Sequence, residues 1–158
     1  MSSFDIAIPK LLKKEGGLSN DKNDRGGLTK YGIAQKFYPT LDIANLTEEN
    51  AKSIYRRDYW NPLRLDEVES QAKAELLFEA GVNFGITTIA KIAQRVVGVK
   101  DDGAVGTKTL EAINTMDDTV FVLAMKLAAV DRYRKICNAD KDQKVFLLGW
   151  LNRILGGA

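Results

Sequence analysis

The 158-residue chain contains no histidine and a single cysteine. Without histidine, neither a Ser-His-Asp triad nor a Cys-His pair can be assembled. The zinc sites of metallopeptidases, which need a His-Glu-x-x-His motif or a Cys/His cluster, are excluded in the same way. Cys137 has no partner for an intrachain disulfide, and we expect it to be a small buried residue. Carboxylate chemistry is then the most accessible hydrolytic route, and glycoside cleavage is its commonest form.

Long apolar runs are also missing. No stretch approaches the ~20 apolar residues of a membrane-spanning helix. The first nine residues contain neither a basic segment nor a long apolar one, so we expect a protein made in the cytoplasm without a signal peptide. The formal net charge is only +2, and no basic run is dense enough to indicate nucleic-acid binding. If the substrate lies outside the membrane, another factor must release the protein.

Apolar residues recur at helical spacing along most of the chain, which predicts a mainly α protein. The first helix ends at Gly16 and Gly17, and Pro9 either kinks it or marks its first turn. Residues 16–32 contain five glycines and read as a loop with a short hairpin. The apolar stripe of the first helix consists of Phe4, Ile8, Leu11 and Leu12.

Later helices have recognisable starts. Thr47 and Asp117 are expected N-caps, because their side-chain oxygens can accept from free backbone amides. The apolar side of the long helix after Asp117 is expected to comprise Phe121, Ala124, Leu127, Ala128, Val130 and Tyr133. The predicted helices span residues 47–59, 70–84, 88–97, 107–113, 117–137 and 146–154. If the chain has two modules, their seam falls within residues 86–100, and we divide it into 1–90 and 91–158 with a packed interface.

Glu15 is the first candidate for catalysis. It stands at the expected C-terminal end of the first helix, where the helix dipole is negative. That dipole and adjacent apolar surface would raise the pKa of Glu15, as a general acid at neutral pH requires. The alternative is a solvated glutamate at a helix end.

A second carboxylate is available from Asp21 or Asp24, and either residue could instead bond its own loop backbone. Thr29 could position a water molecule, cap an element or belong to a strand. A calcium-binding loop starting at Asp21 is ruled out, because Arg25 and Gly32 stand where that loop needs oxygen ligands.

Four further residues are candidates for substrate binding. Tyr31, Tyr59 and Trp60 could stack on sugar rings, since such side chains combine an apolar face with a polar edge. Ordinary packing is the alternative for all three. Asn83 lies four residues after Glu79 on one helix face, and Glu79 is either paired or part of a site wall.

Taken together, Glu15-Gly16-Gly17, Asp24-Arg25-Gly26-Gly27, Thr29 and Tyr31-Gly32-Ile33 resemble the signature of the phage-type N-acetylmuramidases of glycoside hydrolase family 108. The segments 102–110 and 149–153 resemble the predicted peptidoglycan-binding module that follows in such proteins. The order Glu15, Asp24, Thr29 is also similar to the triad of inverting phage lysozymes, with a gap between Asp24 and Thr29 that is one residue shorter.

The resemblance implies a mainly α, lysozyme-like muramidase of a phage or prophage, with no metal and no cofactor. It would be a monomer that cleaves the β-1,4 bond between N-acetylmuramic acid and N-acetylglucosamine in peptidoglycan glycan strands. Glu15 would be the acid, Asp24 would activate water or stabilise the transition state, and Thr29 would help to place the water. Two alternatives remain: a lytic transglycosylase on the same scaffold, and a non-catalytic wall-binding phage protein.

Overall fold

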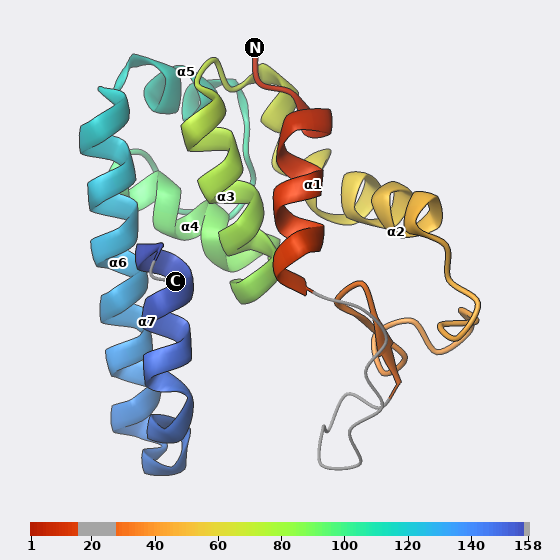
Figure 1. Ribbon diagram of the computed structural model, residues 1–158. Coiled ribbons are helices and arrows are strands. Elements are labelled where there is room, and N and C mark those ends of the chain that lie inside the picture. The colour runs from red at the N-terminus through yellow and green to blue at the C-terminus, as the bar shows by residue number, and fades with distance from the viewer. Residues whose placement is uncertain (16–27, 157–158) are drawn as a thin grey trace.

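The computed structural model describes residues 1–15 and 28–156, and this part of the chain is mainly α-helical (Figure 1). A two-stranded hairpin follows the first helix, as predicted. None of the described helices is both long and apolar enough to cross a membrane. The α-helices are α1 (Phe4–Glu15), α2 (Glu48–Tyr55), α3 (Gln71–Phe84), α4 (Ile86–Val96), α5 (Thr107–Thr115), α6 (Asp118–Ala139) and α7 (Leu147–Leu155). The shorter elements are β1 (Thr29–Lys30), β2 (Ile33–Ala34), the π-helix η1 (Arg56–Trp60) and the 3₁₀ segments η2 (Leu65–Glu67) and η3 (Lys141–Phe146).

Side-chain caps set the starts of three helices. Thr47, Ser70 and Asp117 each accept a hydrogen bond from the backbone N–H three residues later, at 3.2, 3.5 and 3.0 Å. These bonds satisfy amides that have no partner inside the helix. The predicted caps at Thr47 and Asp117 are therefore confirmed.

Helix α1 begins at Phe4, so Pro9 lies inside it, and the expectation that Pro9 marks the first turn is wrong. The helix tolerates the missing N–H because its apolar face is buried against the rest of the protein. Phe4, Ala7, Ile8 and Leu11 are all buried, and Leu12 is half-buried.

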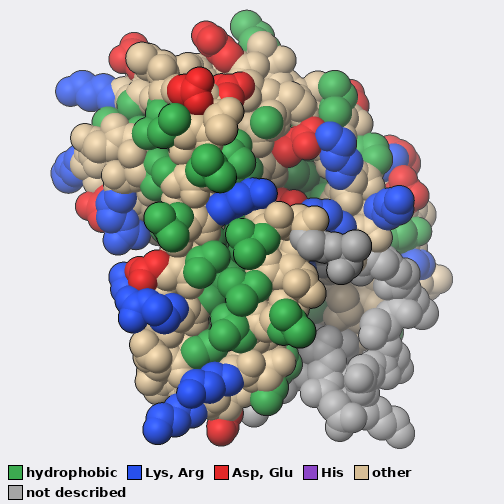
Figure 2. Space-filling model, turned by 60° about the vertical axis from the view of Figure 1, so that its left-hand side comes forward, with side chains coloured by type: hydrophobic (Ala, Val, Ile, Leu, Met, Phe, Trp, Pro, Cys, Tyr) green, Lys and Arg blue, Asp and Glu red, His purple; other side chains and the backbone are tan. Residues whose placement is uncertain are grey.

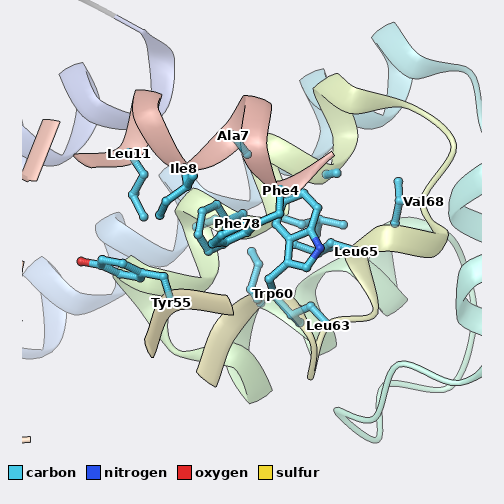
Figure 3. Packing of buried hydrophobic residues seen from close by; sticks show 14 of the residues in the cluster. Phe4, Ala7, Ile8, Leu11, Tyr55, Trp60, Leu63, Leu65, Val68 and Phe78 are labelled. Carbon is cyan, nitrogen blue, oxygen red and sulfur yellow. The ribbon is translucent and has the colours of Figure 1, made fainter. Parts of the chain in front are cut away.

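Three aromatic rings form the centre of the core (Figure 3). Phe4 of α1, Trp60 of η1 and Phe78 of α3 meet edge to face, with ring centroids 5.3–5.8 Å apart. Each such pair contributes roughly 0.5–1.5 kcal/mol beyond the burial of its area. The cluster thus fixes α1 against α3.

The same apolar core continues into the C-terminal half, where it includes Met125 of α6. A buried lysine adds a polar link. Lys73 of α3 is 1% exposed, and its ammonium donates to the carbonyl oxygens of Ile113 and Met116 and pairs with Asp118 at 2.9 Å. It caps the end of α5 and joins the start of α6 to α3.

Helix α6 buries every fourth residue along one side. Leu127 lies on the opposite side with 71% of its surface exposed, so the prediction that it faces inward is wrong. Figure 2 shows an apolar patch on the face of the molecule where α6 and α7 come forward. The exposed apolar side chains of these two helices include Val120, Leu123, Leu127, Leu148 and Leu155. The buried residues of α6 are Phe121, Met125, Ala129, Tyr133 and Cys137.

Candidate active site

Glu15 is the last residue of α1, and ion pairs fix this helix to α3. The ammonium of Lys10 lies 2.7 Å from a carboxylate oxygen of Glu75, and that of Lys14 lies 2.8 Å from one of Glu79. Both pairs join residues 65 apart in the sequence. The two helices therefore run parallel and in register, and Figure 1 shows them ending at the same side of the molecule.

Asn83 lies one turn beyond Glu79 on α3, and so belongs to the end of the helix pair at which α1 stops. Its side chain is half-buried. The amide nitrogen Nδ2 is fully buried and has no hydrogen-bond partner among the residues that the structure describes. A buried donor without an acceptor costs roughly 1–3 kcal/mol. A carbonyl or hydroxyl oxygen of a bound ligand would satisfy it.

Thr29 and Tyr31 belong to the hairpin that follows α1 in the chain. The strands are antiparallel, with Thr29 opposite Ala34 and Lys30 opposite Ile33. Both turn residues have positive φ angles, 53° at Tyr31 and 77° at Gly32. Two successive positive φ angles are the requirement of a type I′ turn, which matches the twist of paired strands. The hairpin thus has a defined register, and Thr29 is half-buried in its first strand.

Tyr55 ties this hairpin to α2 and was missed by sequence reasoning. It is 1% exposed, and its hydroxyl donates to the carbonyl oxygen of Tyr31 at 2.8 Å. Its ring centroid lies 5.7 Å from that of Tyr59. Tyr55 therefore contacts two of the expected sugar-binding residues, through the backbone of Tyr31 and through the ring of Tyr59. The available signal was the four-residue spacing between Tyr55 and Tyr59.

Trp60 does not belong to this wall. Its side chain has no exposed surface, and its indole N–H donates to a carboxylate oxygen of Asp66 at 2.8 Å. A sugar ring has no access to its faces, so stacking by Trp60 is corrected to core packing. The π-helix η1 places Tyr59 half-exposed and the next residue, Trp60, in the core.

Asp58, which precedes Tyr59 in the chain, accepts hydrogen bonds from two other side chains. Arg57 donates to both carboxylate oxygens of Asp58, at 2.5 and 2.7 Å, and the Tyr38 hydroxyl donates to one of them at 2.8 Å. The hydrogen bonds from Arg57 hold the pKa of Asp58 below its usual 3.8. Burial, followed by the bond to Asp58, raises the pKa of Tyr38 far above 10. Asp58 is therefore a fixed anion at neutral pH and is unsuited to donating a proton.

Asp21 and Asp24 lie outside the described residues, and the choice between them stays a prediction. For Glu15 the structure gives the position of the backbone. Within the described ranges no group of three or more acidic, histidine or cysteine side chains is arranged to hold a metal ion. The site is thus an end of two parallel helices, with a tyrosine-anchored hairpin next in the chain.

Two protein-family models together match nearly the whole chain. Residues 8–85 match the family Glycosyl hydrolase 108, and residues 88–155 match a family described as Predicted Peptidoglycan domain. The chain therefore carries a glycosyl hydrolase 108 domain in its N-terminal half and a peptidoglycan domain after it.

A solved structure extends the likeness over the whole fold. The structure of Brucella abortus SagA superposes with a TM-score of 0.76 at 25% sequence identity. The match covers 97% of this chain and 94% of that one. Comparison with curated proteins gives no match. The predicted lysozyme-like, mainly α fold is confirmed.

Proposed function

We propose that this protein hydrolyses the β-1,4 bond between N-acetylmuramic acid and N-acetylglucosamine in peptidoglycan, with Glu15 as general acid. The observation that carries the proposal is the glycosyl hydrolase 108 match, in which Glu15 is the last residue of an ion-paired helix. The peptidoglycan domain that follows supports a cell-wall glycan as substrate. We expect the protein to act as a monomer after another factor releases it to the wall.

The local electrostatics favour an acid at Glu15. The C-terminal end of a helix carries partial negative charge, which disfavours a second negative charge there. The last turn of α1 contains two cations, Lys13 and Lys14. The ammonium of Lys14 donates to both carboxylate oxygens of Glu79 on α3, at 2.8 and 2.9 Å, so the charge of Lys14 is already compensated by another carboxylate.

In the proposed reaction Glu15 protonates the glycosidic oxygen while Asp24 activates a water molecule that Thr29 helps to place. A positioned acid or base of this kind contributes ~10²–10⁴-fold in rate. Because the Thr29 hydroxyl would position a water molecule, we expect inversion of the anomeric configuration. In inverting enzymes the two catalytic carboxyl groups lie roughly 6.5–9.5 Å apart. Inversion of a β bond must release the α-anomer first.

The residues around the hairpin give this chemistry a binding surface. Tyr31 and Tyr59 would present ring faces to sugars, and the half-buried state of both side chains is compatible with that role. The unpartnered amide of Asn83 would donate to an N-acetyl or hydroxyl oxygen. Such convergent polar groups beside aromatic faces are what an oligosaccharide site requires.

Mass spectrometry of digested peptidoglycan tests the proposal. After borohydride reduction, hydrolysis at the proposed bond gives fragments that end in reduced muramic acid. Fragments ending in 1,6-anhydromuramic acid would instead indicate a lytic transglycosylase, and reduced glucosamine ends would indicate cleavage of the other glycan bond. Binding without any fragment would indicate a non-catalytic wall protein. Each of these three outcomes contradicts the proposal.

A further inference from the structure

The face of the peptidoglycan domain between α4 and α6 contains a groove of about 620 Å³. Cationic and apolar side chains line it together, with one carboxylate among them. The match to the peptidoglycan domain covers residues 88–155 as a whole and does not indicate which surface contacts the cell wall. The charged lining residues are Arg95, Asp131, Arg132 and Lys135, and the apolar ones are Ile92, Val96, Ala128, Ile136 and Ala139.

The evidence for a ligand in this groove comes from Arg132. Its guanidinium carbon lies 5.6 Å from the centroid of the Phe84 ring, which orients the group by a cation–π contact. Its Nε is fully buried and has no hydrogen-bond partner in the part of the chain that the structure describes. A guanidinium whose N–H is withdrawn from water without an acceptor is destabilising, and a bound anion would relieve that cost.

The other charges of the groove are already engaged. Asp131 pairs with Lys135 at 2.7 Å and with Arg134 at 2.7 Å, so its negative charge is compensated by those two cations. Arg95 lies 3.7 Å from a carboxylate oxygen of Asp101. Among the described residues Arg132 has no such carboxylate, so it is a partly buried lining cation without an ion-pair partner.

We propose that this groove binds the peptide stem of peptidoglycan through a stem carboxylate held by Arg132. The glycan strand itself is built from neutral sugars at this point, because the lactyl carboxyl of muramic acid is taken up in the amide link to the stem. The stem carries free carboxylates and the methyl groups of alanine. A guanidinium matches the first, and the Ile, Val and Ala side chains match the second.

The lining also argues against a sugar-ring site. Aromatic faces are the usual platform for sugars, yet the described residues that line the groove include no aromatic side chain. Binding of the peptidoglycan would then be divided between two regions of the chain. The N-terminal region would hold the glycan, and the α4–α6 groove would hold the stem that projects from it. This division rests on peptidoglycan as the substrate, as proposed above.

Isothermal titration of the full chain with the free tetrapeptide stem tests the inference, since this probe lacks the glycan that the catalytic region would bind. We expect Arg132→Met to weaken binding about 10- to 150-fold, the range for losing a hydrogen bond to a charged group. Methionine keeps an unbranched apolar side chain next to Phe84. Lys144→Met removes the same charge at an exposed site of the same domain outside the groove, and should change affinity by less than about twofold.

Two further arms identify the ligand group. A stem whose carboxylates are converted to amides should bind as weakly to wild type as the free stem binds to Arg132→Met. In wild-type protein, the NMR signal of the Arg132 Nε–H should move on addition of the stem, which needs no variant to fold.

Equal binding of the amidated stem, unchanged affinity in Arg132→Met, or an Nε–H signal that does not move would each overturn the inference. Binding of poly(glycerol phosphate) that depends on Arg132, with no binding of the stem, would overturn it in favour of a phosphate polymer. None of these measurements depends on hydrolysis. Stem binding by the groove can therefore be disproved while the proposal for Glu15 stands, and the proposal for Glu15 can be disproved while stem binding stands.

Discussion

Replacing Lys73 by methionine should destabilise the whole chain strongly. Its ammonium is buried and serves three oxygens at once, the carbonyls of Ile113 and Met116 and the carboxylate of Asp118. Methionine retains most of the aliphatic stem, so the change removes mainly the charge and its hydrogen bonds. Two carbonyls at the end of α5 lose their cap, and Asp118 loses its cation.

The expected loss in the free energy of unfolding is about 2–6 kcal/mol, because each of the two carbonyl acceptors that lose their donor costs about 1–3 kcal/mol. Asp118 is 59% exposed and adds little, since water replaces its lost partner. At roughly 2–4 °C per kcal/mol for a chain of this size, the melting temperature should fall by about 4–24 °C. Lys10→Met is the matched control. Lys10 is paired to Glu75 through a side chain that is 59% exposed, and exposed pairs contribute about 1 kcal/mol or less.

The pH dependence adds a second check. Hydrogen bonds from Ser70 and Lys73 lower the pKa of Asp118 below 3.8. A carboxyl group whose pKa is lower in the folded state than in the unfolded state stabilises the fold at pH values above its unfolded-state pKa. This contribution is lost as the pH falls through its folded-state pKa. The difference in stability between wild type and Lys73→Met should therefore narrow below about pH 4. It should not vanish, because the two carbonyl bonds do not titrate with Asp118. Urea unfolding at pH 7 and pH 3 measures both effects, and a loss below 1 kcal/mol at pH 7 would refute the reasoning.

Two further predictions concern the candidate active site. Tyr55→Phe removes the hydrogen bond to the Tyr31 carbonyl, which should cost about 0.5–1.5 kcal/mol of stability by urea unfolding. Lysis by this variant should slow more in kcat than in KM, because the hairpin is positioned less well; unchanged kcat would mean that the bond only stabilises the fold. Asp24→Asn should slow lysis at least ~10²-fold, the low end for a positioned acid or base, while Asp21→Asn should be mild. The reverse pattern would make Asp21 the partner, and two mild losses would favour a mechanism with a single glutamate.

Much of the helical fold could be predicted, because its signals are local. Thr47 and Asp117 cap helices as expected, and the helix expected over residues 70–84 is α3 at Gln71–Phe84. The position of Glu15 at the end of α1 follows from the apolar stripe before it and the two glycines after it. These signals lie within a few residues of the feature that they determine, so one sequence is enough to find them.

The misplaced residues depend on contacts between distant segments. Trp60 and Tyr59 are neighbours in the chain with similar chemistry, yet only the packing of η1 against Phe4 and Phe78 decides which ring is buried. The apolar character of Leu127 predicts an inward position, although the buried residues of α6 lie along another side of the helix. The uncompensated charge of Arg132 is visible only once Asp131 is seen to pair elsewhere. Propensity and spacing contain none of this information.

The measurement that tests the central claim most directly is the lysis rate of Glu15→Gln on purified peptidoglycan. Glutamine keeps the shape of the side chain but has no acidic proton, so we expect clearing to fall to a few per cent of the wild-type rate or less, consistent with the ~10²–10⁴-fold contribution of an acid. Glu111→Gln, the same change at an exposed position of α5, should clear the suspension at the wild-type rate. Circular dichroism should show the same helix content for both variants. Clearing by Glu15→Gln near the rate of Glu111→Gln would contradict the assignment of Glu15 as the catalytic acid.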